Sequence, residues 1–328
     1  MQMAHLRIHF TEADFRRTRL ALSMDHMWEI VNAVQLLQHC GGGLYFDSWR
    51  QRVRQQAHAD PQLRRLLHML VHLAPHSTYF PDLLTPVGEF DDLNAGINAV
   101  LSVPKRRLRI EIGRMSTPTA SLRGIAAGDR SALHGLRDAF RIFHRVAVAP
   151  ELDITGAARG TDVSRRMHTY VNDGIDALLN GICPDGVWAP PMLTLPYPVD
   201  QDLFLAGRGI RLVPTFFCLR HPVTLADPLL PPTLVFPIDP SARLLATEQQ
   251  QGDHLGALLG TTRAAILRLV LDGCTSRDLI RRIGVAPATI THHTSILRNA
   301  GVITTHRDGT VATHHITPLG IELLSHTG

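Results

Sequence analysis

The stretch RDLIRRIGVAPATITHHTSILRNAGVI, residues 277–303, has the pattern of two short helices joined by a turn. Leu279 and Ile283 recur at helical spacing in the first half, and Gly284-Val285-Ala286 has the composition of a tight turn. Pro287 follows at a position suited to the first residue of a helix, where the missing N–H costs nothing. The stretch therefore predicts a helix-turn-helix.

The second helix of this pair is predicted to have one apolar and one polar side. At about 100° per residue, Ile290, Leu297 and Ala300 share one side, with His293 and Thr294 at its margins. The opposite side carries only small or polar residues, which are Ala288, Thr291, His292, Ser295 and Asn299. Such a face is narrow enough to enter the DNA major groove, which is about 12 Å wide.

The flanking segments extend the pattern. Apolar residues at helical spacing predict a helix from His254 that Gly273 ends, and Thr275 or Ser276 is suited to cap the next helix. Downstream, Gly301 is a helix stop, and the sequence then predicts two strands, a hairpin turn and a last helix. These elements are expected at 302–307, 308–309, 311–316 and 317–324. This order predicts a winged helix-turn-helix domain.

Residues 255–324 resemble the winged-helix repressors of the ArsR type. The resemblance is carried by LGTTRAAIL (259–267), TITHH (289–293), ILRNAGVI (296–303) and TPLG (317–320). Thr294 departs from the family pattern, which usually has leucine there. The resemblance implies a homodimer that binds double-stranded DNA, with two recognition helices in successive major grooves about 34–36 Å apart.

Position on the predicted helices nominates the residues that contact DNA. We expect Ala288, Thr289, Thr291, His292 and Ser295 to face bases or adjacent phosphates. None of them is an arginine or asparagine, so thymine methyl contacts, His292 to a purine acceptor and DNA shape would supply the readout. The arginines that could meet phosphates are Arg277, Arg281, Arg282, Arg298 and Arg307. Each arginine has a simple solvated position as its alternative, and His293 is expected to pack rather than to bind DNA.

The rest of the chain predicts an α+β fold, with a mainly helical N-terminal domain and a small sheet. The expected helices are 25–38, 46–57, 61–73, 93–101, 106–115, 130–148 and 162–179, and Thr11 is expected to cap a further helix after a strand at 6–10. Strands are expected within 192–199, 202–217 and 233–238, where prolines favour short, bulged or edge positions. A polar segment around residues 241–253 places the boundary near Gln250, giving domains 1–250 and 251–328.

Three segments upstream are similar to the long N-terminal region of actinobacterial regulators of this winged-helix class. They are LRIHFTEADF (6–15), FPDLLTP (80–86) and DLFLAGRGIRLVPTFF (202–217). We expect this region to serve as a sensor or dimerisation domain, and a small-molecule effector is possible there. Aromatic residues that could line an effector pocket, or could simply form core, are Trp28, Tyr45, Phe46, Trp49, Trp188, Phe204, Phe216 and Phe217.

Other chemistries find little support in the sequence. The formal charge of +4 permits an acidic partner such as DNA but does not identify one. The four cysteines are far apart, no common metal-binding box of this family is present, and His68 and His72 are expected on a solvated helix face, so neither a metal nor a cofactor is expected. No catalytic motif is found, and no apolar block suggests a signal peptide or membrane span, so we expect a cytoplasmic protein.

Two other functions remain open. The winged helix could serve as a protein-interaction scaffold, which would bind a protein partner but not DNA. The N-terminal domain could instead be an enzyme with an appended regulatory head, in which case turnover would survive deletion after Gln250.

Overall fold

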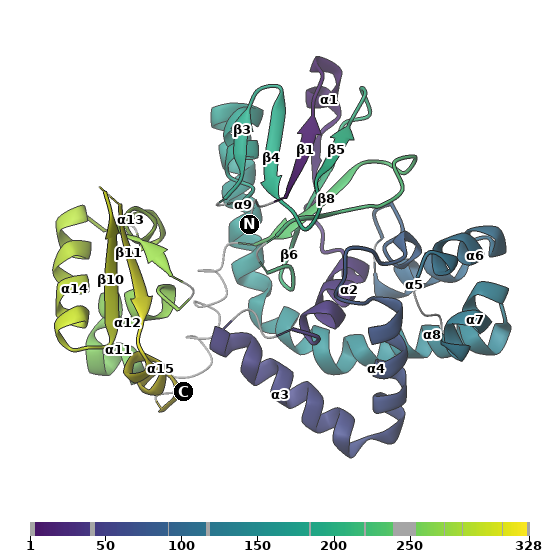
Figure 1. Ribbon diagram of the computed structural model, residues 1–328, viewed down its shortest axis with the longest axis horizontal. Helices are drawn as coiled ribbons and strands as arrows, with labels where there is room; N and C mark the ends of the chain where they lie inside the picture. Colours follow the sequence, from purple (N-terminus) through teal and green to yellow (C-terminus); the bar gives the residue numbers. More distant parts are fainter. Residues whose placement is uncertain are drawn as a thin grey trace. The chain divides into compact units, whose positions relative to one another are not determined.

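A computed structural model describes residues 4–39, 43–90, 92–115, 119–183, 185–219, 221–238, 254–271, 273–283, 285–309 and 311–326. The chain forms two compact units, residues 1–41 with 48–238 and residues 42–47 with 239–328 (Figure 1). The predicted boundary near Gln250, and the polar segment around it, lie outside the described residues.

The N-terminal unit is mainly helical. Its helices are α1 (Glu12–Arg17), α2 (His26–Leu36), α3 (Gly43–Ala59), α4 (Pro61–Leu73), η1 (Asp82–Leu84), α5 (Leu93–Leu101), α6 (Lys105–Gly113), α7 (Ala120–Ala127), α8 (Arg130–Phe143), η2 (His144–Val148) and α9 (Ala149–Asn180). The predicted bounds of α4 and α5 are confirmed, and Thr11 and Asp14 form the expected capping arrangement on α1. Two predictions were incomplete, because α7 was not predicted and α9 begins well before Asp162.

The first sheet places β1 between later strands. Its order is β3 (Val187–Ala189), β4 (Met192–Pro196), β1 (His5–His9) and β5 (Gln201–Phe204), with β1 antiparallel to β4 and parallel to β5. One face contributes Leu6, Ile8 and Leu203 to the buried core. The other face carries Arg7, which pairs with Asp202 at 2.8 Å.

The second sheet has the order β2 (Arg19–Leu20), β6 (Arg211–Thr215), β8 (Thr233–Pro237) and β7 (Val223–Thr224). Of the expected alternatives, short, bulged or edge strands, the first holds for β6 and β8, which have five residues each and are the inner strands. Proline is tolerated in β6 because β2 pairs only with Arg211 and Leu212, so Pro214 lies beyond the end of β2. The unit therefore has two small sheets instead of the one that was expected.

A buried carboxylate accepts hydrogen bonds from the backbone just after the end of β6. Glu29 of α2 is fully buried and accepts hydrogen bonds from the backbone N–H of Phe216, at 2.9 Å, and of Phe217, at 3.1 Å. These two donors would otherwise be buried without a strand to accept from them. Glu29 thus joins the helical part of the unit to its second sheet.

A second carboxylate joins the two ends of the N-terminal unit. Asp14 is fully buried and accepts from Gly209 N at 2.8 Å. Gly209 has φ +70°, and a Cβ there would lie 2.5 Å from the carbonyl carbon of Arg17. The position therefore requires glycine, and it brings the segment after β5 against α1.

The C-terminal unit has the order of a winged helix-turn-helix. Its elements are α11 (His254–Leu259), α12 (Thr261–Leu269), β9 (Cys274–Thr275), α13 (Ser276–Ile283), α14 (Pro287–Asn299), β10 (Ile303–Asp308), β11 (Val311–Ile316) and α15 (Pro318–His326). The single helix expected from His254 is two helices, because Gly260 has φ +83° and interrupts it. The hairpin β10–β11 pairs with β9 to form a three-stranded sheet.

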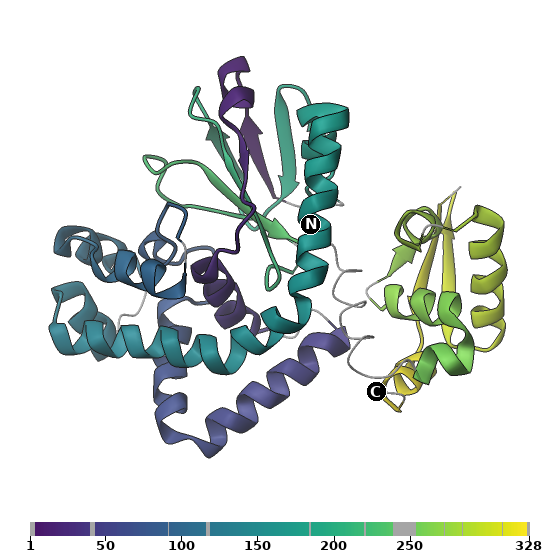
Figure 2. The ribbon, with the colours of Figure 1, turned by 180° about the vertical axis from the view of Figure 1, so that it is seen from behind.

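The helices of this unit share one core with the sheet. Helices α11 and α12 lie behind the hairpin in Figure 1 and in front of it in Figure 2, so the hairpin covers one side of the helices. Leu267, Leu279, Ile290 and Ile303 are among the buried residues of this core. The predicted fold class, an α+β chain that ends in a winged helix, is confirmed.

Candidate nucleic-acid interface

Helix α14 is held in place by its apolar side. Ile290, Thr294 and Leu297 are buried there. Thr294 occupies the position where the family usually has leucine, and its hydroxyl donates to Ile290 O at 2.9 Å. The polar atom is therefore satisfied inside the core, and the threonine causes no unpaired group.

The other side of α14 faces solvent. Ala288, Thr291 and His292 are exposed, while Thr289 and Ser295 are half-buried. Thr291 donates its hydroxyl proton to Pro287 O at 3.0 Å, so its methyl group is available for an apolar contact. A threonine methyl is suited to contact the methyl group of thymine in a major groove.

The predictions for two residues, Ala300 and His293, have different outcomes. Ala300, which the helical wheel placed on the buried side, is exposed, because α14 ends at Asn299 and the chain turns there. His293 is half-buried, and its Nδ1 is buried with no hydrogen-bond partner among the described residues. Burial, followed by the nearby positive charge of His292 and Arg263, lowers the pKa of His293. The ring is therefore packed and neutral at physiological pH.

Three exposed arginines lie in α14 or in the elements directly before and after it along the chain. Arg277 lies in the first turn of α13, Arg298 in the last turn of α14 and Arg307 near the end of β10. Arg282 is half-buried, and the side chain of Arg281 lies outside the description. Helix α14 contains no Asp or Glu, so nothing on it repels a phosphate backbone.

Asp278, the acidic residue that precedes α14 most closely in the sequence, is hydrogen-bonded within the protein. Thr275 donates its hydroxyl to Asp278 Oδ2 at 2.6 Å and accepts from Asp278 N at 3.2 Å. Thr275, one of the two residues predicted to cap this helix, is therefore the cap of α13. The carboxylate of Asp278 is engaged at the start of the helix, where the helix dipole favours a negative charge.

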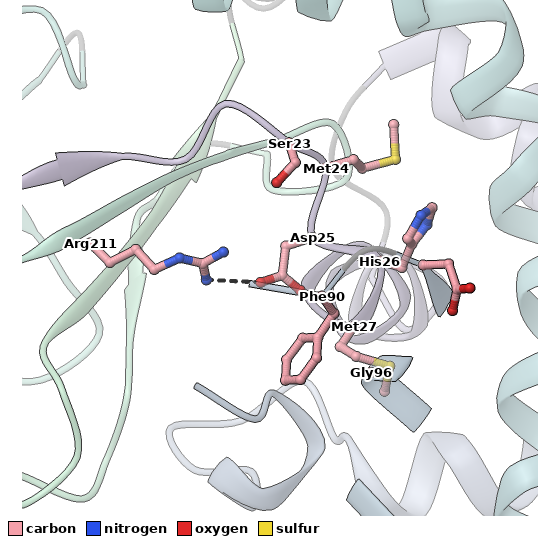
Figure 3. A pocket seen from close by; sticks show the side chains of 9 residues that line it. Ser23, Met24, Asp25, His26, Met27, Phe90, Gly96 and Arg211 are labelled. Carbon is pink, nitrogen blue, oxygen red and sulfur yellow. Dashed lines mark hydrogen bonds and ion pairs between the residues drawn. The ribbon is translucent and has the colours of Figure 1, made fainter. Parts of the chain in front are cut away.

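A second candidate site is a pocket in the N-terminal unit (Figure 3). It is a shallow depression of about 10 Å³, with room for about one water molecule, and is lined by Ser23, Met24, Asp25, His26, Met27, Phe90, Asp92, Gly96 and Arg211. Arg211 Nη1 donates to Asp25 Oδ2 at 2.9 Å, whereas Arg211 Nε is buried without a hydrogen-bond partner among the described residues. An acceptor oxygen entering the pocket would satisfy this nitrogen.

A half-buried histidine pair adjoins the pocket. His26 Nδ1 lies 3.1 Å from Nε2 of His144, which is in the π-helical turn η2. Burial lowers the pKa of His26, and burial together with His26 lowers the pKa of His144 to about 4. Both rings are neutral near pH 7, so one donates to the other without charge repulsion.

None of the aromatic residues proposed for an effector pocket lines this one. Their alternative interpretation as core holds for Trp28, Phe46, Trp49, Phe216 and Phe217, which are all buried. Phe204 is 62% exposed and stacks on His9, and Trp188 donates to Asp176. The side chain of Tyr45 lies outside the description.

Histidines at metal-like spacing are engaged with the protein. His72 Nδ1 lies 2.7 Å from His68 O, and neither ring is joined by a third ligand among the residues that the structure describes. His314 is buried while His315 is exposed, so the two point to opposite sides of β11. Within the described ranges, no helix has the length and apolar character needed to cross a membrane.

Comparison with known proteins identifies the C-terminal unit. Residues 260–305 match a family model described as "Bacterial regulatory protein, arsR family". The match runs from the start of α12 through α13 and α14 into β10, so it covers the whole helix-turn-helix and the first three residues of β10. This part of the chain is therefore similar to the ArsR-family helix-turn-helix, a similarity that supports a DNA-binding transcriptional regulator. No curated protein and no solved structure matched the chain.

Proposed function

We propose that this protein is a cytoplasmic, sequence-specific transcriptional regulator that binds operator DNA as a homodimer. The observation that carries the proposal is that α14 has two different sides. Ile290 and Leu297 are buried on one side, and small polar side chains are exposed on the other. The homodimer follows from the resemblance of residues 255–324 to ArsR-type repressors. A dimer presents two copies of α14 to one duplex, which doubles the contacts.

In this proposal the residues divide into two roles. Ala288, Thr289, Thr291, His292 and Ser295 face base edges, as the N-terminal part of a recognition helix does. Arg277, Arg298 and Arg307 contact phosphates and fix the register of the protein on the duplex. Affinity then depends strongly on salt, with a slope of log K against log salt of about −0.9 for each phosphate contact.

A mobility-shift titration against the promoter region of the chain's own gene tests the proposal. The wild-type chain is expected to form a salt-sensitive complex, and Thr291→Ala/His292→Ala is expected to weaken it. Thr161→Ala/His58→Ala is the matched control, because both residues are exposed on helices of the N-terminal unit and Thr161, like Thr291, donates its hydroxyl to the carbonyl four residues before it. Binding that ignores both salt and the double substitution contradicts the proposal, and a stoichiometric protein partner without DNA binding would favour the scaffold alternative.

We further propose that the N-terminal unit tunes operator affinity, with the pocket at Asp25 and Arg211 as the effector site. The unpartnered Nε of Arg211 supplies a donor, and Met24, Met27 and Phe90 supply an apolar wall. An effector changes operator affinity only if it binds one arrangement of the dimer better than another. The pocket has room for about one water molecule in this structure, so a larger effector would bind an arrangement in which the pocket is open, with a carbonyl oxygen toward Arg211 Nε.

A small-molecule library screened by thermal shift on the full chain tests the effector site. Hits are expected to shift operator affinity, and their stabilising effect is expected to disappear in Arg211→Gln but to persist in Arg16→Gln, a matched change at an exposed arginine. Hits that bind equally well to Arg211→Gln would place the effector elsewhere.

A further inference from the structure

His314 joins three elements of the C-terminal unit through one buried ring. Its side chain is 3% exposed, its Nε2 lies 2.9 Å from Ser276 Oγ, and its Nδ1 lies 2.9 Å from Thr305 Oγ1. Both ring nitrogens are therefore satisfied, one as donor and the other as acceptor, because each hydroxyl can take either role. The ring connects β11 to the first residue of α13 and to the middle of β10.

The two partners of this ring lie next to exposed arginines. Ser276 directly precedes Arg277. Thr305 is two residues before Arg307, and side chains alternate along a strand, so both lie on the same face of β10. His314 lies on this face too, because its register partner across the hairpin is Thr305. The buried ring thus fixes the bases of two segments whose arginines point into solvent.

The ring is held in a neutral state. Burial lowers the pKa of His314, and the positive charges of Arg298 and His315 lower it further. A neutral imidazole can bridge two hydroxyls without a counter-ion, so the connection needs no carboxylate near the DNA-facing side. A carboxylate in its place would repel phosphate.

We propose that His314 is a positioning residue for DNA binding, which holds the wing arginine Arg307 at a fixed spacing from Arg277. This inference rests on the proposed function. With the spacing fixed in the free protein, both guanidinium groups meet phosphates without loss of wing freedom on binding. His314 itself touches no DNA, because it is buried.

The substitution His314→Phe tests the proposal, because it keeps a ring and removes both nitrogens. Operator affinity is expected to fall by roughly tenfold for each protomer, as for one lost charge-assisted hydrogen bond in each. The slope of log K against log salt is expected to become shallower by about 0.9 for each protomer. His315→Phe is the matched control, since it makes the same change one residue along on the exposed side of β11, and it should leave the slope unchanged.

A second pair of variants covers the case in which His314→Phe does not fold. Thr305→Val removes one hydrogen bond and keeps the shape of the side chain, whereas Thr305→Ser keeps the hydroxyl. The valine variant is expected to have a lower affinity and a shallower salt slope, as His314→Phe does. The serine variant is expected to keep the affinity and salt slope of the wild type.

A double-mutant cycle with Arg307→Ala shows whether His314 acts through the wing arginine. If it does, His314→Phe adds little to the loss already caused by Arg307→Ala. Fully additive losses, or a reduced affinity with an unchanged salt slope, overturn the proposal while the proposed function stands. A wild-type chain that binds no DNA overturns the proposed function and this inference together.

Discussion

Gly209 shows how strictly a single residue is determined by its surroundings. It combines φ +70° with a backbone neighbour 2.5 Å from where a Cβ would stand, whereas Gly207 has φ +80° and its nearest atom at 3.7 Å. We expect Gly209→Ala to destabilise the N-terminal unit by about 2 kcal/mol or more, and Gly207→Ala by only about 1 kcal/mol. The difference between the two losses of stability measures the steric clash alone, because both substitutions share the backbone strain.

Urea unfolding followed by tryptophan fluorescence measures this difference. All three tryptophans, Trp28, Trp49 and Trp188, belong to the N-terminal unit, so the signal reports this unit alone. Equal losses in the two variants would mean that the segment around Arg17 moves freely enough to accept a methyl group.

The pair His26–His144 makes the stability of the N-terminal unit depend on pH. Burial lowers both pKa values, that of His144 to about 4, so the folded state holds the neutral rings while the unfolded chain takes up protons below about pH 6.5. The contribution of the pair is therefore complete above pH 6.5 and is lost as pH falls toward 4. Asp25, Asp92 and Asp153 oppose the shift, and Arg159 adds to it.

The free energy of unfolding between pH 4 and pH 7 checks this prediction. Carboxylates also titrate in this range, so the informative quantity is the difference between the wild type and His144→Gln. We expect the variant to have a shallower rise of stability with pH. A parallel pair of curves would show that the ring of His144 does not titrate with unfolding.

At the scale of elements, α14 lacks a capping side chain at its N-terminus. Ala286 is in the N-cap position with φ −59° and ψ 148°, and it makes no side-chain cap hydrogen bond. We expect Ala286→Ser to stabilise the C-terminal unit by about 1 kcal/mol, because the hydroxyl can accept from a free N–H of the first turn. Ala288→Ser places the same residue inside the helix, where no such gain is expected.

Thermal unfolding followed by far-ultraviolet circular dichroism measures the capping effect, since the C-terminal unit has no tryptophan. Equal melting temperatures for Ala286→Ser and wild type would show that the first turn is already satisfied by solvent.

The sequence predicted some elements closely and others poorly, for local physical reasons. The helix-turn-helix was predicted well because Gly, Pro and capping residues mark its ends and its apolar spacing is regular. The first half of α9 was missed because Gly156 and Gly160 lower helix propensity, although Leu152 and Val163 are buried and hold the segment in place. Gly260 was missed as a break because the leucines on either side keep a helical spacing across it.

Sites differ from elements in how far a sequence predicts them. The exposed face of α14 follows from one helical wheel, which correctly assigned Ala288, Thr291, His292 and Asn299 as exposed. It was wrong for Ser295, which is half-buried, and for Ala300, which is exposed. The pocket is lined by residues 23–27, 90, 92, 96 and 211, which meet only in the folded unit, and no local sequence pattern around any of them predicts it. The DNA contacts themselves remain predictions.

At the scale of the whole molecule, the proposed dimer predicts a two-part footprint. Protection of the operator is expected in two half-sites whose centres are about 10–10.5 base pairs apart, on one face of the duplex. Sedimentation of the free protein is expected to give twice the chain mass of 36.3 kDa. Thr291→Ala/His292→Ala should remain dimeric while losing the footprint, and a single protected half-site would contradict the symmetric arrangement.

The carboxylate of Glu29 has a consequence for how the molecule behaves in a crowded cell. Exposed strand borders invite strands from other chains, and this is a common route to aggregation. Beyond the end of β2, the N–H groups of Phe216 and Phe217 already donate to Glu29, so these two donors are not offered to an intruding strand. A helix side chain thereby protects this border against association with unrelated chains without lengthening the sheet.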